Sequence, residues 1–230
     1  VEFELDGKTC HIGAIAKGSG MIHPNMATML AFVTSDVAIS KDMLNEVIHE
    51  VVDDTFNMVS VDGDTSTNDM LTLMCNGLAQ NNEITQKDEN YQCFKKALMY
   101  ICTCLSQAIA KDGEGATKLL TCRVLHAKTK KDAKIVAKSV ITSSLLKAAM
   151  FGEDANWGRI LCAIGYSDAD YDIQKIDVDF KSKKGKICVC QNGGGYPFSE
   201  EEAAQILSED EIEIILSLIH ISEPTRLQLI

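Results

Sequence analysis

Thr28 has the most distinctive surroundings of any residue with a reactive side chain in this sequence. It lies in a glycine-rich and proline-bent segment, residues 16–30, which reads AKGSGMIHPNMATML. Gly18 and Gly20 permit a positive φ or a close approach of the backbone to a neighbour, and Pro24 prevents a helix from continuing through the segment. A self-reacting peptide bond would need a constrained backbone of this kind directly before a hydroxyl residue.

The hydroxyl group of a threonine is a weak nucleophile unless a base lies next to it. The α-amino group of Thr28 becomes such a base once the peptide bond from Ala27 is cut, and its ordinary pKa of about 7.7–8.0 leaves a sizeable free-base fraction near neutral pH. Most isolated threonines in apolar segments are structural. The small residue before Thr28 and the glycine-rich segment that leads to it are what single it out.

Other groups of residues that could bind a metal or a nucleotide, or catalyse hydrolysis, match the known motifs for these functions poorly. The segment 62–68 imitates a calcium loop, but Thr67 replaces the required glycine and Leu73 the bidentate glutamate. The glycines at 18 and 20 lead to a proline rather than to a helix, and the chain has no P-loop motif. Its five histidines show neither ligand spacing nor the partner motifs of a hydrolase triad. We therefore expect no metal and no nucleotide cofactor.

The elements that must position these residues follow from hydrophobic periodicity. Alternating apolar residues around the turn at 6–8 predict a β-hairpin, and residues 29–34 are typical of a buried strand. For the rest of the first half we expect a helix at 41–58 capped by Ser40, a strand at 59–67, an apolar element of either type at 69–78, and a helix at 89–110. For the second half we expect strands at 120–127, 159–165, 175–180 and 186–190, and helices at 132–151 and 199–216.

Helices and strands are mixed here without strict alternation, which favours an α/β fold of the layered α+β kind. The glycine-flanked turn at 112–115 indicates a domain boundary near residue 117.

Composition and charge exclude several classes of protein. A net charge of −11 disfavours a nucleic-acid partner and an anionic membrane surface, and no apolar run approaches the ~18 residues that span a bilayer. The nine cysteines are an odd number without metal-ligand spacing, and we interpret them as reduced thiols of a cytoplasmic protein.

Four motifs in one order resemble those of a known family. They are KGSGMIHPNMATMLAFVTSD at 17–36, FNMVSVDGDTSTND at 56–69, DGEGATK at 112–118 and FGEDANWGRI at 151–160. Together they resemble the ornithine acetyltransferase (glutamate N-acetyltransferase) family of arginine biosynthesis. The resemblance covers roughly residues 1–217. It implies a self-processing core at 1–117 that carries the cleavage loop, and a smaller C-terminal α+β domain at 118–217.

The resemblance also implies a reaction. The family precursor cleaves itself at the bond that matches Ala27–Thr28, and the freed Thr28 takes an acetyl group from N-acetylornithine and passes it to glutamate. Lys17, by itself an ordinary surface lysine, matches a substrate-contacting lysine of the family. Glu114, by itself a turn residue, matches the substrate-binding glutamate, whose carboxylate suits the α-ammonium group of an amino acid. Acetyl-CoA is a further possible co-substrate.

The resemblance implies as partner the cleaved N-terminal chain, in a heterotetramer of two chain types. The sequence opens without Met inside a strand pattern, and 218–230 departs from the family's ending, so we expect missing residues before Val1 and a non-native tail at 218–230. Because the family's oxyanion-hole donors match residues upstream of Val1, this fragment is expected to be inactive alone. On the residues alone, a self-processing N-terminal-nucleophile amidohydrolase or aminopeptidase and a non-catalytic acidic interaction domain stay open.

Overall fold

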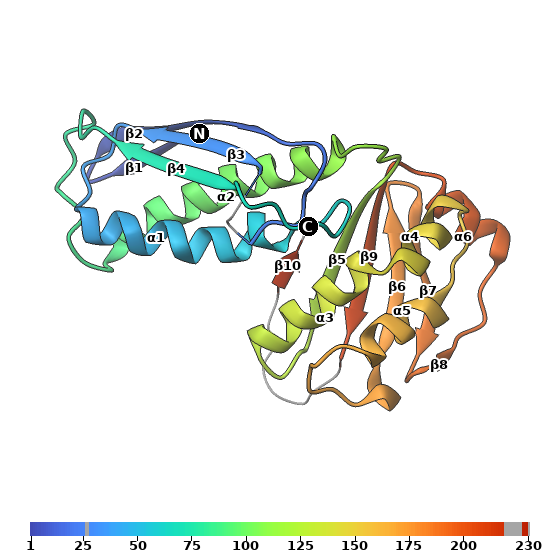
Figure 1. Ribbon diagram of the computed structural model, residues 1–230. Helices are drawn as coiled ribbons and strands as arrows, with labels where there is room; N and C mark the ends of the chain where they lie inside the picture. Colours follow the sequence, from blue (N-terminus) through green and yellow to red (C-terminus); the bar gives the residue numbers. More distant parts are fainter. Residues whose placement is uncertain (26–27, 219–226, 230) are drawn as a thin grey trace. The chain divides into compact units, whose positions relative to one another are not determined.

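The computed structural model describes residues 1–25 and 28–218 in full and the backbone of residues 227–229. The chain divides into two compact units, Val1–Glu114 and Gly115–Ile230. Both combine helices with a sheet, which confirms the α/β class of mixed elements (Figure 1). Among the described residues, no helix is both long and apolar enough to cross a membrane.

The first unit is built on a four-stranded sheet of order β1-β2-β3-β4. Strands β1 to β3 pair antiparallel, and β3 and β4 pair parallel. The elements of this unit are β1 Glu2–Leu5, β2 Lys8–Lys17, β3 Leu30–Ser35, α1 Lys41–Asp54, the 3-10 helix η1 Phe56–Met58, β4 Met70–Cys75 and α2 Glu89–Lys111.

The hairpin β1–β2 forms as the sequence predicts. Asp6 and Gly7 both have positive φ, 52° and 71°, which suits the tight turn that matches the twist of two antiparallel strands. Ser40 caps α1 as expected, because its hydroxyl oxygen accepts the backbone N–H of Met43 at 3.4 Å.

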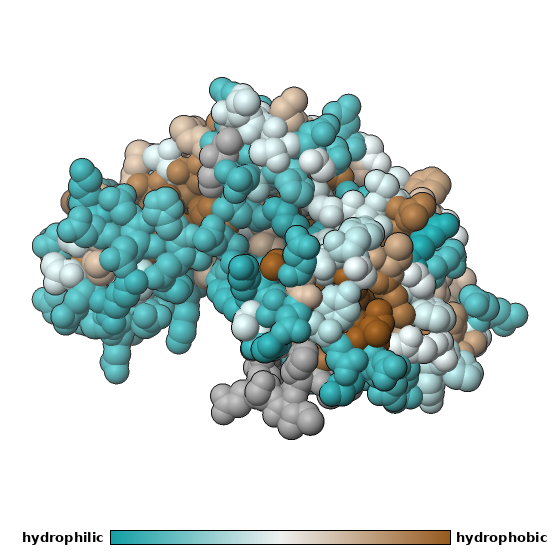
Figure 2. Space-filling model, turned by 60° about the horizontal axis from the view of Figure 1, so that its bottom comes forward, coloured by the Kyte–Doolittle hydropathy of each residue, from teal (hydrophilic) through white to brown (hydrophobic). Residues whose placement is uncertain are grey.

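One face of this sheet packs on helix α2, and α1 packs beside α2 (Figure 1). Side chains that alternate along the strands, such as Ile12 on β2 and Val33 on β3, are buried in one hydrophobic core with Phe94 and Leu98 of α2. The outward side of α1 carries charged residues, and Figure 2 shows this surface as mainly hydrophilic.

The opposite face of the sheet exposes apolar side chains. Ile15 is 70% exposed, Phe32 37%, Met70 39% and Met74 50%. Ile15 lies opposite Phe32 in the β2–β3 pairing, and Met70 and Met74 stand at alternating positions of the neighbouring strand β4. These four residues are called the outer apolar face below. Such an exposed group of large apolar residues is typical of a contact surface.

The second unit is a six-stranded sheet of order β10-β5-β9-β6-β7-β8, in which β5 and β9 are parallel and the other pairs antiparallel. Helix α3 packs on β5, and α6 packs on β6 and β7. Its elements are β5 Leu119–Leu125, α3 Lys130–Thr142, α4 Ser144–Phe151, α5 Trp157–Gly165, the 3-10 helix η2 Ile173–Lys175, β6 Asp177–Ser182, β7 Gly185–Gln191, β8 Gly194–Gly195, α6 Glu200–Leu207, β9 Glu211–Ser217 and β10 Leu227–Leu229.

Several expected elements differ in the structure. The strand expected at 159–165 is wrong, because these residues lie in helix α5. Asn156 caps this helix by accepting the Arg159 N–H at 3.2 Å, and Ile160, Ala163 and Ile164 are buried at helical spacing. The helix expected at 132–151 is broken at Ser143, whose hydroxyl caps α4 by accepting the Leu146 N–H at 3.3 Å.

The helix expected at 199–216 ends at Leu207. Strand β9 follows it, because Ile212, Ile214 and Leu216 alternate with more exposed residues and are buried on one face of the sheet. The strand expected at 59–67 is likewise wrong. That segment is irregular, and its polar groups bond to another loop.

The non-native tail expected at 218–230 stays a prediction. Leu218 is buried and its backbone N–H donates to the Leu125 carbonyl at 3.0 Å. Residues 219–226 and 230 lie outside the described residues.

Candidate functional site

The segment that carries Thr28 is a loop that joins two neighbouring strands. The chain leaves β2 at Lys17 and enters β3 at Leu30, and these two residues are paired in the antiparallel register. Thr28 lies just before β3 and is half-buried, and the next residue, Met29, is fully buried. We call the described residues 18–25 and 28–29 the threonine loop. Ala27, the residue before the expected cleavage point, lies outside the described residues.

The backbone of the threonine loop is strained at one described position. Met21 has a φ of 56°, in the left-handed region, which costs a non-glycine residue about 1–3 kcal/mol. Gly18 and Gly20 instead serve close approach, since a Cβ on Gly18 would lie 2.9 Å from the side chain of Ile22. Both were expected to allow either a positive φ or a close approach, and they serve the second purpose.

Glu114 lies against the start of the same loop. Its backbone N–H donates to the Ser19 carbonyl at 3.0 Å, and a Cβ added to Gly20 would lie 2.6 Å from its Oε2. The exposed side chains of Lys17 and Glu114 therefore stand near the first residues of the loop, and Thr28 stands near its last. The fold brings the three sequence-predicted residues to the ends of one loop.

A second segment, residues 59–69, holds the threonine loop in place. The Asp62 carboxylate accepts the backbone N–H groups of Met21 at 2.7 Å and Ile22 at 3.1 Å. Burial opposes the charge on Asp62, but the N–H groups of Asp64, Ile22 and Met21 outweigh it and lower the pKa of this carboxyl. The calcium-like motif thus uses its first carboxylate to bind backbone amides.

The middle of the loop is held at His23. Its ring Nδ1 lies 2.9 Å from the Ser60 hydroxyl, and its carbonyl accepts the Thr65 hydroxyl at 3.0 Å. The backbone N–H of Val61 also donates to the carbonyl of Ile22 at 2.7 Å. Side-chain and backbone groups of one segment therefore fix the described residues before the expected cleavage point.

Asp69 holds the loop on the other side of Thr28. Its Oδ1 accepts the backbone N–H of Met29 at 2.8 Å, and the N–H of Met70 donates to the carbonyl of Met29 at 2.8 Å. Asp69 is only 9% exposed, and its Oδ2 is buried without a hydrogen-bond partner in the described part of the chain. Burial raises the pKa of Asp69, although the backbone N–H groups of Met29 and Asn25 oppose the shift.

Sequence reasoning did not identify Asp69. The parallel register pairs Leu30 with Met70, so Met29 and Asp69 stand side by side just before their strands. An aspartate directly before an apolar strand was the available signal. Its meaning depends on a pairing between strands that are far apart in the sequence.

The arrangement can support nucleophilic chemistry by a hydroxyl group on a held loop. No cluster of three or more His, Cys, Asp or Glu residues in the described ranges could hold a metal ion. All nine cysteines are free thiols, and burial raises the pKa of several of them, Cys75 and Cys102 among them, which makes these thiols poor nucleophiles.

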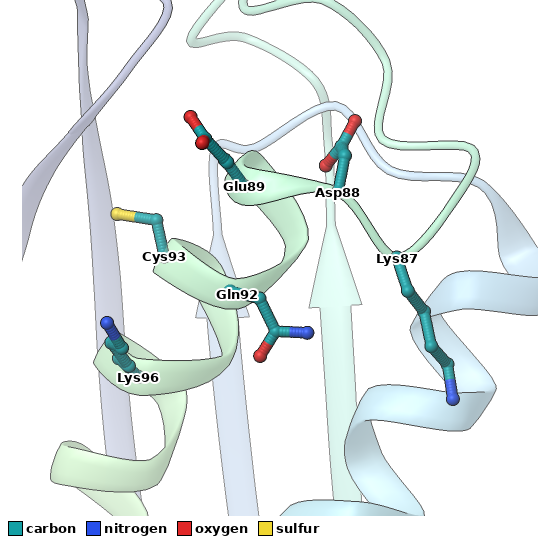
Figure 3. Close-up of a pocket in the computed structure, with 6 residues that line it drawn as sticks. All are labelled: Lys87, Asp88, Glu89, Gln92, Cys93 and Lys96. Carbon is teal, nitrogen blue, oxygen red and sulfur yellow. The ribbon is translucent and has the colours of Figure 1, made fainter.

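A pocket elsewhere in the first unit is unrelated to the threonine loop. It lies at the beginning of α2 and is lined by Lys87, Asp88, Glu89, Gln92, Cys93 and Lys96 (Figure 3). Lys87 there points toward α1 and forms ion pairs with Glu46 at 2.5 Å and Glu50 at 2.8 Å. This pocket is an open, charged surface and contributes nothing to the site.

Fold and site together define a mixed α/β protein of two units with a threonine on a strained loop held at both ends. The model of the ArgJ family matches residues 1–226, and the chain belongs to that family. This confirms the family that the four motifs indicated.

Two curated relatives carry the name arginine biosynthesis bifunctional protein. The ArgJ 1 protein of Clostridium acetobutylicum is 54% identical over 95% of this chain and 53% of its own length. The ArgJ protein of Caldanaerobacter subterraneus subsp. tengcongensis is 50% identical over 95% of this chain and 54% of its own length. The chain therefore spans about half the length of the curated relatives it matches.

A crystal structure of the arginine biosynthesis bifunctional protein argJ from Bacillus halodurans has the same fold. It aligns with a TM-score of 0.81 at 40% identity, over 87% of this chain and 93% of the chain in the crystal. That crystallised chain is thus about half as long as the curated full-length relatives.

Proposed function

We propose that this chain is the nucleophile-bearing part of an acetyltransferase that moves an acetyl group from N-acetylornithine to glutamate, giving ornithine and N-acetylglutamate. The observation that carries the proposal is the threonine loop. Hydrogen bonds from residues 59–70 hold it on both sides of Thr28, and Lys17 and Glu114 stand at its start.

The first step is self-cleavage at the bond between Ala27 and Thr28. The Thr28 hydroxyl attacks the carbonyl carbon of Ala27, the C–N bond breaks, and the acyl group moves from nitrogen to oxygen. Water then hydrolyses this ester, which leaves a carboxylate on Ala27 and a free α-amino group on Thr28. The strained φ of Met21 supports this step, because a loop held out of its relaxed conformation can favour the attack geometry.

Acetyl transfer follows in two half-reactions. The α-amino group of Thr28 takes the proton of its own hydroxyl as the oxygen attacks the acetyl carbonyl of N-acetylornithine. The proton goes to the leaving amine, ornithine departs, and the acetyl group stays on Thr28 as an ester. The amine of glutamate then attacks this ester, which regenerates the hydroxyl.

Lys17 and Glu114 are proposed as substrate contacts. The Lys17 ammonium group at the end of β2 suits a substrate carboxylate or the charge that develops on the acetyl oxygen. The Glu114 carboxylate suits the α-ammonium group of an amino-acid substrate. Both side chains are exposed on this chain and so are available to a ligand.

The proposed partner is the N-terminal chain released by the cleavage, in a heterotetramer with two copies of each chain. Two observations support it. The crystallised Bacillus halodurans chain has about half the length of the curated relatives, as splitting would produce, and the outer apolar face exposes four large apolar side chains in the first unit. We propose no nucleic-acid or membrane partner and a location in the cytoplasm, which the net charge of −11 and the nine free thiols support.

The reaction as written needs no bound cofactor. Acetyl-CoA is proposed only as a further acetyl donor, because the acetyl-threonine ester would be the same whichever donor supplies it.

The test is the Thr28→Ala variant of the full-length protein. Wild-type protein is expected to run as two fragments on a denaturing gel, and the variant as one chain, because it lacks the attacking hydroxyl. Thr28→Ser keeps a hydroxyl and is the matched control, expected to split more slowly. Splitting of the alanine variant at the same bond would contradict self-cleavage by Thr28.

Mass spectrometry of the split protein separates the competing functions. Incubation with N-acetylornithine should add one acetyl group to Thr28, and glutamate should remove it as N-acetylglutamate. An amidohydrolase would lose the group to water instead, and an interaction domain would acquire none.

A further inference from the structure

We propose that Asp69 is a positioning residue for the nucleophile and that its carboxylate holds the α-amino group of Thr28 once cleavage has released it. This inference rests on the proposed function and adds a residue to it. It concerns the processed protein, in which Thr28 begins a chain.

The carboxylate is bound to the residue directly after that amine. Oδ1 of Asp69 lies 2.8 Å from the backbone nitrogen of Met29. Backbone bond lengths put the nitrogen of Thr28 only about 3–4 Å from the nitrogen of Met29. The α-amino group of Thr28 would therefore form beside an acceptor that is already held at its neighbour.

The second oxygen of Asp69 has no hydrogen-bond partner among the residues that the structure describes. Oδ2 is buried without a hydrogen bond in the described part of the chain, and Asp69 as a whole residue is only 9% exposed. A buried carboxylate in this state is unfavourable, and a cationic donor is the group that relieves it best. Before cleavage the nitrogen of Thr28 is an uncharged amide, and after cleavage it is an amine that can carry a positive charge.

The chemistry then gives Asp69 a defined task. When the amine takes the proton of the Thr28 hydroxyl it becomes an ammonium group, and the Asp69 carboxylate stabilises that charge and fixes the direction of the N–H bonds. The proton later passes from the ammonium group to the leaving amine, and Asp69 stays ionised throughout. A carboxylate that orients a base without taking its proton plays the same part in hydrolase triads.

Several other titratable groups belong to the loop, to its ends or to the segment 59–69 packed on it. Lys17 and Glu114 stand near its start, and His23 is engaged with Ser60. Asp62 is held by backbone N–H groups, and one of these belongs to the exposed Asp64. Among the described residues, Asp69 is the acidic group bound directly to the residue after Thr28.

The experiment uses Asp69→Asn in the full-length protein, with N-acetylornithine and glutamate as substrates. The amide oxygen of asparagine can still accept the Met29 N–H, so the chain should still split. Acetyl transfer should fall by ~100-fold or more, in the range that general-base function contributes. Without the negative charge the Thr28 ammonium group is less stable, so the pKa of the amine falls and the acidic limb of the kcat/KM profile should move to lower pH.

Asp62→Asn is the matched control, because it changes an aspartate of the same segment that binds the other side of the loop. It should reduce the yield of split protein but leave the acidic limb of the split fraction at its wild-type pH. Asp69→Glu keeps the charge at a changed distance. It should recover part of the lost acetyl transfer and return the acidic limb of the kcat/KM profile to its wild-type pH.

The outcomes separate this inference from the proposed function. If wild-type protein transfers no acetyl group, the proposed function is wrong whatever Asp69 does. If wild-type protein transfers acetyl and Asp69→Asn matches it in rate and pH limb, only the role of Asp69 is wrong. An unsplit or unfolded Asp69→Asn, with Asp69→Glu equally affected, would also overturn the role, because Asp69 would then support the loop rather than the amine.

Discussion

Glu114 is held by backbone contacts that do not involve its carboxylate. Its N–H donates to the carbonyl of Ser19, whereas Glu114 as a residue is exposed and its Oε2 lies next to Gly20. Removing the charge should therefore leave the loop intact. A variant at this position therefore tests the proposed substrate binding separately from the proposed splitting, which needs no amino-acid substrate.

We predict that Glu114→Gln in the full-length protein lowers kcat/KM for acetyl transfer by about 30-fold or more, since truncating one member of a charged contact costs ~2–5 kcal/mol. Splitting should stay near wild type on a denaturing gel. Near-wild-type transfer would remove Glu114 from the site, and lost splitting would show that it supports the loop instead.

Gly20→Ala tests the position of the Glu114 carboxylate by changing the residue next to it. Gly20 is not among the glycines with positive φ, so alanine fits the backbone, but its Cβ would meet Oε2 of Glu114 at 2.6 Å. The flexible carboxylate must move aside, and transfer should fall while splitting persists. Gly13→Ala is the control, because its Cβ would meet only Thr34 Oγ1, at 3.7 Å.

Among single residues, the sequence analysis singled out those that belong to motifs. It missed Asp69, whose position depends on the pairing of β3 with β4. Thr28, Lys17 and Glu114 were singled out from glycine-rich context and family resemblance, and their roles stay predictions. Asp69 depends on the parallel register of β3 and β4, which no local pattern contains.

The elements were predicted where periodicity was long and unambiguous. Helix α2 was expected at 89–110 and is found at Glu89–Lys111, and β3 was expected at 29–34 and is found at Leu30–Ser35. The predictions were wrong where helical spacing of apolar residues changes to strand alternation, and where a polar residue interrupts an apolar pattern. The acidic residues at the start of α6 suggest a helix, and the alternating apolar residues of β9 that follow were not recognised as a strand. Ser143 divides a continuous apolar pattern into two helices.

Helices α1 and α2 are linked by Glu50. Its carboxylate pairs with Lys87 at 2.8 Å and with Lys95 at 2.5 Å, and these hydrogen bonds lower its pKa from 4.5 to about 2. A carboxyl group with a lowered pKa in the folded state stabilises that state above its unfolded pKa, and the contribution disappears as the pH falls through the folded value.

We predict that Glu50→Gln lowers the free energy of unfolding of the full-length protein by ~1 kcal/mol at pH 7, because solvent screens a side chain that is 32% exposed. The difference from wild type should fade between pH 4.5 and about 2. Urea denaturation followed at several pH values measures it.

Glu46→Gln is the control for this prediction. Glu46 pairs with Lys87 and is 47% exposed, so a smaller loss is expected. An equal loss for Glu50→Gln at pH 2.5 and pH 7 would mean that the side chain acts through packing and not through charge.

At the scale of the whole molecule, the outer apolar face is an exposed group of large apolar side chains in the first unit. Ile15 has the largest exposed fraction of its four residues, at 70%. If the face packs against the released N-terminal chain, a charge placed there must be desolvated on assembly, at a cost of several kcal/mol.

We therefore predict that Ile15→Lys in the full-length protein weakens the association of the two fragments by at least 10-fold, as measured by sedimentation of the split protein. Leu78→Lys is the control, because Leu78 is 74% exposed but lies in the turn after β4, outside the outer apolar face. Fragments that stay associated in Ile15→Lys as firmly as in the control would contradict a contact at this face.

From the glycine-flanked turn, the sequence analysis expected a domain boundary near residue 117. The structure divides the chain after Glu114. The alternation of β2 predicted a strand, but which of its faces would stay uncovered depends on where α1 and α2 pack. That packing is decided by contacts between distant residues.

The bonds that shape the threonine loop join residues 37 to 42 positions apart. On a ribosome the loop therefore emerges well before the segment that holds it, and it gains its shape only after α1 has formed and β4 has docked beside β3. Any cleavage that depends on that shape must therefore follow the folding of these elements. If the loop does cut itself, molecules in which β4 has not docked beside β3 should remain uncut.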